Sequence, residues 1–123
     1  MQESSVLRAE QNYQKFRSTK QEMLRLQAAI VGFFDMDETY VTPKQKEEYA
    51  SYLKKRIRPA LQALLRENRI DAIELADEMG WFGNGILEEL IIKAQEEGRF
   101  SAVIRLMRKK AVRYGYRDHD FSI

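Results

Sequence analysis

Two segments of this sequence resemble each other, IRPALQALLRENRIDAI at residues 57–73 and LEELIIKAQEEGRFSAV at residues 87–103. A shift of thirty residues places the second on the first and aligns their apolar positions. The aligned pairs are Ile57 with Leu87, Leu61 with Ile91, Leu64 with Ala94, Glu67 with Glu97, Arg69 with Arg99, Ile70 with Phe100, Ala72 with Ala102 and Ile73 with Val103. A period in this range is typical of stacked helical hairpins. We therefore expect each copy to be a helix, a short turn and a second helix.

The rest of the chain also has helical periodicity. Apolar residues spaced by three and four predict a first helix from about Ser5 to Phe34. Thr42 and Gln45 form a capping box around Pro43, which predicts the start of a second helix. Pro59 lies inside the apolar pattern that follows, so we expect a kink or a short break near residue 58. Shorter helices are predicted at 70–79, 85–97 and 100–114, with Gly98 as a left-handed terminator.

These patterns predict one all-α domain, residues 1–123, with five to six helices. A long N-terminal helix and its loop (1–41) would pack against two stacked helix-turn-helix hairpins (42–114), and an irregular tail (115–123) would follow. The apolar stripe of the last helix is predicted to be Phe100, Val103, Ile104, Met107, Ala111 and Tyr114. The predicted core includes Leu64, Ile73, Leu90, Ile91, Leu106 and Met107. A plain orthogonal bundle, with accidental similarity between its halves, is the alternative architecture.

Residues 57–114 support a resemblance to a known family. The segment ELIIKAQEEGRFSAVIRLMRKKA resembles the paired helices of an ankyrin repeat, and ALQALLRENRIDAIELADEMGW is similar, with Asn68 at the turn. The region also resembles C-terminal helical units of functionally unassigned Firmicutes proteins. The Thr-Pro-Leu-His start of an ankyrin repeat is missing, and only two copies exist. The resemblance implies protein binding in a bacterial protein rather than chemistry.

Composition limits the function classes. The chain of 123 residues contains no cysteine, which excludes disulfides, thiolate metal sites and a cysteine nucleophile. The segment MQESSVLRAEQ lacks the pattern of a signal peptide, and the longest apolar run is about half of what a bilayer span needs. We therefore expect a cytoplasmic protein without a membrane partner. No phosphate loop or nucleophile elbow is present. The single histidine, His119, has no second histidine beside it, so neither an enzyme nor a cofactor is expected.

Charge is divided between two neighbouring blocks. Residues 71–98 contain eight acids and one base, whereas residues 99–117 contain seven bases and no acid. In one interpretation, the acidic helix 85–97 packs beside the basic helix 100–114 and the charges complement each other. In the other, the bases form an exposed face for nucleic acid or for an acidic partner.

A helix-turn-helix that binds DNA is the alternative function. Its recognition helix would begin near Asn84, but that helix carries Glu88, Glu89 and Glu96, which phosphates would repel. A non-catalytic protein-interaction or regulatory module is therefore the first hypothesis. An aromatic pair on a glycine-flanked turn and the bases of the last helix are the candidate partner-binding residues. They are Trp81, Phe82, Arg105, Arg108, Lys109 and Arg113.

Overall fold

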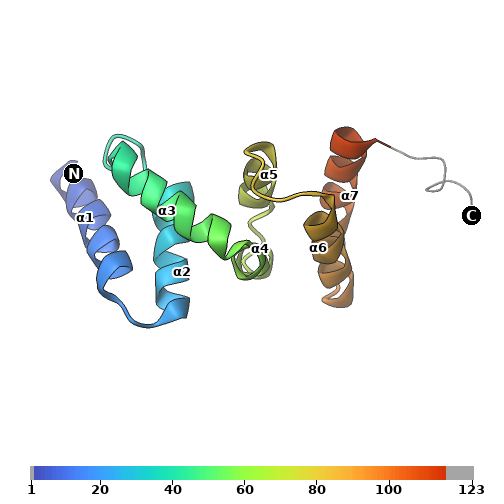
Figure 1. Cartoon of the computed structure of the whole chain (residues 1–123), viewed down its shortest axis with the longest axis horizontal. Coiled ribbons are helices and arrows are strands. Elements are labelled where there is room, and N and C mark those ends of the chain that lie inside the picture. The colour runs from blue at the N-terminus through green and yellow to red at the C-terminus, as the bar shows by residue number, and fades with distance from the viewer. Residues whose placement is uncertain (1, 116–123) are drawn as a thin grey trace, which may run out of the picture. The chain divides into compact units, whose positions relative to one another are not determined.

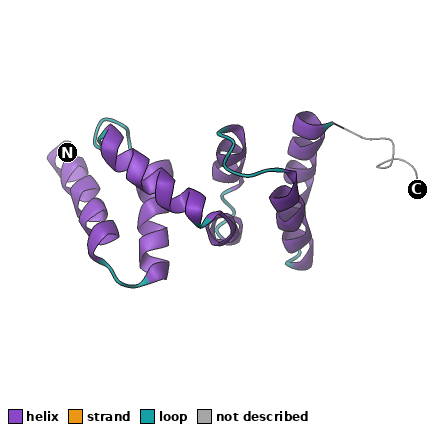
Figure 2. Ribbon diagram, viewed as in Figure 1, coloured by secondary structure: helices purple, strands orange, loops and turns teal. Residues whose placement is uncertain are grey.

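A computed structural model describes residues 2–115, and every regular element in that range is helical (Figures 1 and 2). The predicted all-α class is confirmed. The described range contains seven α-helices, so the predicted count of five to six was too low. The helices are α1 (Gln2–Ser18), α2 (Glu22–Ile30), α3 (Pro43–Lys55), α4 (Ile57–Arg66), α5 (Ile70–Glu78), α6 (Asn84–Glu96) and α7 (Phe100–Tyr114). A π-helical turn, η1 (Val31–Asp35), continues α2.

The helices belong to two compact units, and the chain passes from one to the other between Ala60 and Leu61, inside α4. The first unit contains α1, α2, η1 and α3. The second contains α5, α6 and α7. The prediction of one domain over residues 1–123 stays a prediction, and most of the predicted tail lies outside the described residues.

In the first unit, the predicted helix over residues 5–34 is divided into two. The chain leaves helical geometry after Ser18, and α2 starts at Glu22. The Arg25 side chain donates hydrogen bonds to the carbonyl oxygens of Phe16, at 3.1 Å, and Thr19, at 2.6 Å. These bonds satisfy carbonyl groups that the end of α1 leaves without helical partners. The Arg25 side chain, from the first turns of α2, thus stabilises a break that contains neither glycine nor proline.

The break lets α1 fold back onto its neighbours through aromatic rings. The Phe16 ring is centred 4.8 Å from the Tyr49 ring and 5.5 Å from the Tyr52 ring, both edge-on. Asn12 donates hydrogen bonds from its side chain to the carbonyl oxygen of Ala28, at 2.9 Å, and to the Tyr49 hydroxyl, at 3.2 Å. Aromatic rings of α1 and α3 therefore pack together, and Asn12 connects this cluster to the backbone of α2.

The start of α3 and the break after it agree with the sequence. The backbone N–H of Gln45 donates to the Thr42 hydroxyl, and the Gln45 side chain accepts from the Thr42 N–H, which completes the capping box. The break falls at Arg56, which has φ −123° and ψ 42°. Pro59 becomes the third residue of α4, where it has no intrahelical hydrogen bond to lose.

In the second unit, two turns thirty residues apart have the same backbone geometry. The turn after α4 has Asn68 at φ 57°, and the turn after α6 has Gly98 at φ 71°. Asn68 N–H donates to Leu65 O at 3.0 Å, and Gly98 N–H donates to Gln95 O at 3.1 Å. The N–H groups of the next residues close a second bond, Arg69 to Leu64 O at 2.7 Å and Arg99 to Ala94 O at 2.9 Å. This pair of bonds is the Schellman motif, which requires a left-handed residue.

The helices that follow these turns begin alike. Arg69 has φ −93° and ψ 61°, and Arg99 has φ −90° and ψ 70°, directly before the first residues of α5 and α7. The aligned residues Ile70 and Phe100 therefore open their helices at the same position. Local geometry repeats with the period of the sequence.

Most of the predicted core residues are buried. Leu64, Ile73 and Leu106 are at most 1% exposed, and Leu90 and Ile91 are 4% and 8% exposed. Met107 is the exception, because 53% of it is exposed. The predicted apolar stripe of the last helix was therefore wrong in its orientation.

Candidate interaction surface on the last helix

The buried face of α7 is rotated from the predicted stripe. Its buried residues are Ala102, Val103 and Leu106, and of these only Val103 belonged to that stripe. The helix contacts both α5 and α6. Three bases on the side toward α5 form ion pairs with acids of that helix. They are Arg105 with Glu74, Lys109 with Glu78 at 2.7 Å, and Arg113 with Asp77 at 3.5 Å.

The pairs show how α5 and α7 are oriented. Arg105 and Lys109 each lie 31 residues after the acid that they contact. Because both pairs have the same offset, the two helices run in the same direction with equivalent positions almost side by side. Antiparallel helices would instead give a falling offset. The acidic side of α5 is thus the surface that receives α7.

The acids in this contact differ in their environment, since Glu78 accepts a hydrogen bond and Asp77 is buried without one. The hydrogen bond from Lys109 to Glu78 raises the pKa of the ammonium group. Asp77 is 1% exposed, and neither of its carboxylate oxygens accepts a hydrogen bond within the described chain. Burial raises the pKa of Asp77, and the charges of Arg113 and Lys109 oppose that effect.

The contact with α6 includes an ion pair between Lys110 and Glu88 at 3.5 Å. We expected the acidic helix 85–97 to supply the carboxylates for the basic helix. The two helices do pack together, but most of the ion-paired acids come from α5.

The opposite side of α7 exposes large apolar side chains. Phe100 is 70% exposed, Ile104 58% and Met107 53%. Their spacing of four and three places them on one helical face, one turn above another. Ile92 of α6 is also 55% exposed, one turn after Glu88, whose carboxylate reaches α7. We call Phe100, Ile104 and Met107 the α7 stripe.

Arg108 borders this stripe, one turn after Ile104. It is exposed and makes no ion pair within residues 2–115. Of the four bases proposed from sequence, Arg105, Lys109 and Arg113 contact acids of α5, and Arg108 alone lies beside the apolar stripe. The sequence contains a signal for this surface, since the stripe residues repeat at helical spacing, but the same spacing led to the wrong prediction that Met107 belongs to the core.

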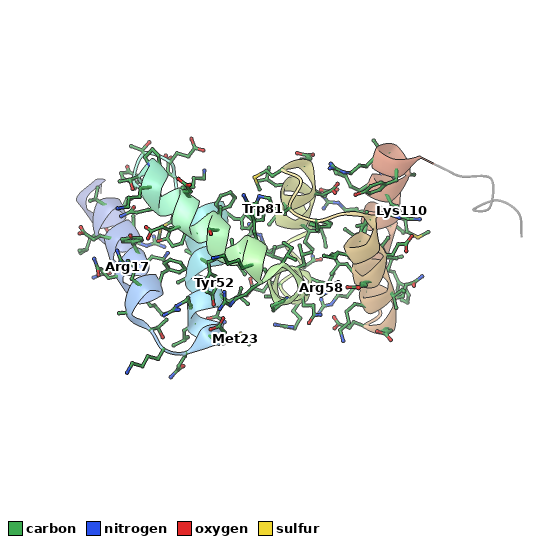
Figure 3. All side chains as sticks on the ribbon, viewed as in Figure 1. Arg17, Met23, Tyr52, Arg58, Trp81 and Lys110 are labelled. Atoms are coloured by element: carbon green, nitrogen blue, oxygen red, sulfur yellow. The ribbon has the colours of Figure 1, made fainter. Side chains whose placement is uncertain are left out.

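The aromatic pair after α5 is divided by the fold. Phe82 is 6% exposed, whereas Trp81 is half-buried on the loop that leaves α5 (Figure 3). Gly80, with φ 76°, ends α5, and the Trp81 N–H donates to Ala76 O at 3.0 Å. Phe82 thus packs in the core.

Other kinds of site find little support in the described residues. Residues 2–115 hold no group of three or more carboxylate, histidine or cysteine side chains placed to bind a metal ion. None of the described helices combines the length and apolar character needed to cross a membrane. His119 lies outside the described residues.

Comparison with known proteins gave no match to a family model, a curated protein or a solved structure.

Proposed function

We propose that this chain is a non-catalytic protein-interaction module and that the α7 stripe is its docking surface. One observation carries the proposal: three large apolar side chains of one helix face are each more than half exposed. Contiguous apolar surface of this kind is costly in water and marks interaction sites. Aromatic and methionine side chains are also enriched in the centres of protein interfaces.

Stacked helical hairpins are the architecture that we propose for the second unit. The matched turns at Asn68 and Gly98 support this arrangement, as do the two ion pairs between α5 and α7 whose partners lie 31 residues apart. In such a stack, each hairpin buries its apolar side against the next. The ankyrin-like resemblance, the bacterial source and the cytoplasmic location remain predictions.

A nucleic-acid-binding regulator is the alternative function, and the charges favour it less. Arg105, Lys109 and Arg113 contact carboxylates, so they offer a polyanion less uncompensated charge. The helix that would lie in the DNA groove, α6, carries exposed Glu88 and Glu89.

Affinity capture from a lysate of the cells that express this chain tests the function. Partners should be recovered by the wild-type chain after nuclease treatment and lost with Ile104→Glu/Met107→Glu. A matched control, Val6→Glu/Leu7→Glu, changes two apolar residues of α1 with 49% and 56% exposure. The control should retain the partners, and thermal melting by circular dichroism checks that all three chains fold. Recovery that nuclease abolishes, or that the α7 variant retains, would contradict the proposal.

A further inference from the structure

Ile104 and Met107 of the α7 stripe, together with Arg108 beside it, occupy the same positions on their helix as the acids of α5 do on theirs. In the thirty-residue alignment, Glu74, Asp77 and Glu78 correspond to Ile104, Met107 and Arg108. The three residues of α5 receive Arg105, Arg113 and Lys109 of α7. The α7 stripe is therefore the face on which a further helix would stack with the same geometry.

The chemistry of that face differs from the chemistry of α5. Two acids are replaced by the apolar residues Ile104 and Met107, and the third is replaced by the base Arg108. Suppose that a further helix packs on α7 as α7 packs on α5. Along that further helix, two positions would face the apolar Ile104 and Met107, and a position between them would face the cation of Arg108. Apolar residues and one carboxylate complement this pattern.

From this complementarity we propose that the α7 stripe binds an acidic amphipathic helix of another protein. The helix would carry apolar residues at positions i and i+8, opposite Ile104 and Met107, and a carboxylate at i+4, opposite Arg108. This inference rests on the proposed function and adds the chemistry of the partner. In this mode of recognition, the apolar face of the partner helix contacts the α7 stripe, and the charge of Arg108 selects a partner that carries a carboxylate.

Charge favours a different protein over a second copy of this chain. The helix α7 contains no acid. A second copy that docked through its own α7 stripe would therefore offer Arg108 no carboxylate from that helix, and it would lack the charge complement that the surface selects.

Two helical peptides, each locked by a hydrocarbon staple, serve as probes. Both carry leucine at positions i and i+8, and they differ only at i+4, which is glutamate in one and lysine in the other. A third peptide has the composition of the first in a scrambled order that removes the apolar stripe. Binding to the full chain is measured by fluorescence anisotropy at low and physiological salt.

We expect the glutamate peptide to bind about 3- to 10-fold more tightly than the lysine peptide, with a smaller ratio at physiological salt. Arg108→Glu should reverse the preference. Ile104→Glu should abolish binding of both, and the scrambled peptide should not bind. Arg99→Glu is the matched charge control, because Arg99 lies before α7 and already contacts Glu97 at 2.7 Å; it should leave the preference intact.

Several outcomes would overturn the inference, and they are distinguishable from failure of the function. If both peptides bind equally and Arg108→Glu changes neither affinity, the inference of an acidic partner is wrong, while the proposal of an apolar docking surface still holds. Absence of peptide binding, with lysate capture still dependent on Ile104, means that the partner is not such a helix. Self-association that Ile104→Glu abolishes, seen by analytical ultracentrifugation, assigns the surface to a second copy. If capture also ignores Ile104, the proposed function fails as well.

Discussion

Asp77 of α5 and Arg113 of α7 form an ion pair without a hydrogen bond. Their closest atoms, Oδ1 and Nε, are 3.5 Å apart, and neither Asp77 oxygen accepts a hydrogen bond among the described residues. The Asp77 side chain is 2% exposed and that of Arg113 is 37% exposed. A carboxylate that is removed from water without hydrogen bonds is poorly stabilised in its charged form. The contact between the two helices therefore contains a group that weakens it when ionised.

This arrangement predicts a pH-dependent stability difference between the wild type and Asp77→Asn. Burial raises the folded-state pKa of Asp77 above its ordinary value, so the folded chain holds this proton more tightly. Its contribution is then favourable at acid pH and is lost as pH rises through the raised pKa. The free energy of unfolding of Asp77→Asn, relative to wild type, should increase from pH 3.5 to pH 7.5 in urea titrations.

Asp71→Asn is the control of opposite sign. The hydrogen bond from Arg69 lowers the pKa of Asp71, so its contribution is present above the ordinary pKa and lost as pH falls. Asp71→Asn should therefore lose stability relative to wild type as pH rises. A difference for Asp77→Asn that is flat, or that follows Asp71→Asn, would mean that water reaches Asp77.

The left-handed turn at Gly98 predicts a selective response to substitution. Gly98→Ala should lower the free energy of unfolding by about 1–2 kcal/mol, since a Cβ at positive φ meets the backbone. Gly98→Asn should cost less, because Asn68 adopts the same conformation at the equivalent turn.

Gly85→Ala is the matched control for that substitution. A Cβ at this second position of α6 meets nothing within 4 Å, and alanine favours the helix by roughly 0.5–1 kcal/mol. Chemical denaturation monitored by circular dichroism measures all three variants. Equal costs for alanine and asparagine at residue 98 would contradict the argument.

Sequence patterns predicted the helix ends that depend on residues within three or four positions. They failed at the break in the N-terminal helix, which depends on a side chain further along the chain. The capping box at Thr42 and the turn at Gly98 depend on neighbours within a few positions. The break after Ser18 depends on hydrogen bonds from Arg25, so no glycine or proline announces it.

The prediction of which face of α7 is buried was wrong for a similar reason. The spacing of apolar residues in this helix fits the core as well as it fits an interface, and periodicity alone cannot distinguish them. The acids of α5, about thirty residues earlier, pair with one side of α7 and so contribute to which apolar residues are buried. The sequence therefore identifies the residues of the candidate surface as an apolar stripe, but it does not indicate that they are exposed.

The close approach of Gly32 and Tyr49 predicts that the first unit will not accept a side chain at residue 32. A Cβ there would lie 2.3 Å from two atoms of the Tyr49 ring. Tyr49 is 1% exposed and its hydroxyl accepts a hydrogen bond from Asn12, so the ring has little room to move. Gly32→Ala should lower stability by about 1–3 kcal/mol, as overpacking does.

A double-mutant cycle with Tyr49→Leu separates this clash from other causes. If the ring is the obstacle, Gly32→Ala should cost less in the Tyr49→Leu background than alone. The two single variants and the double variant are compared by urea denaturation. Strictly additive costs would place the effect of Gly32→Ala in the helix backbone instead.

Truncation of neighbouring residues in α7 tests its observed orientation. Leu106 is fully buried, so Leu106→Ala should cost about 2–5 kcal/mol. Met107 is 53% exposed, and Met107→Ala should change stability by less than about 0.5 kcal/mol. Thermal and urea unfolding measure both variants. Comparable losses would mean that the stripe is packed in solution.

Duplex DNA should bind weakly, because few cations of α7 are free of carboxylate partners. Arg105, Lys109 and Arg113 contact acids of α5, and Lys110 contacts Glu88. Each phosphate contact contributes roughly one unit to the slope of the logarithm of affinity against the logarithm of salt concentration. With Arg108 as the main unpaired base, we expect a shallow slope and no submicromolar binding at physiological salt. Titration of labelled duplex at two salt concentrations measures both quantities, with Arg105→Glu/Arg108→Glu as the control. Submicromolar binding that this variant abolishes would favour the nucleic-acid function over protein docking.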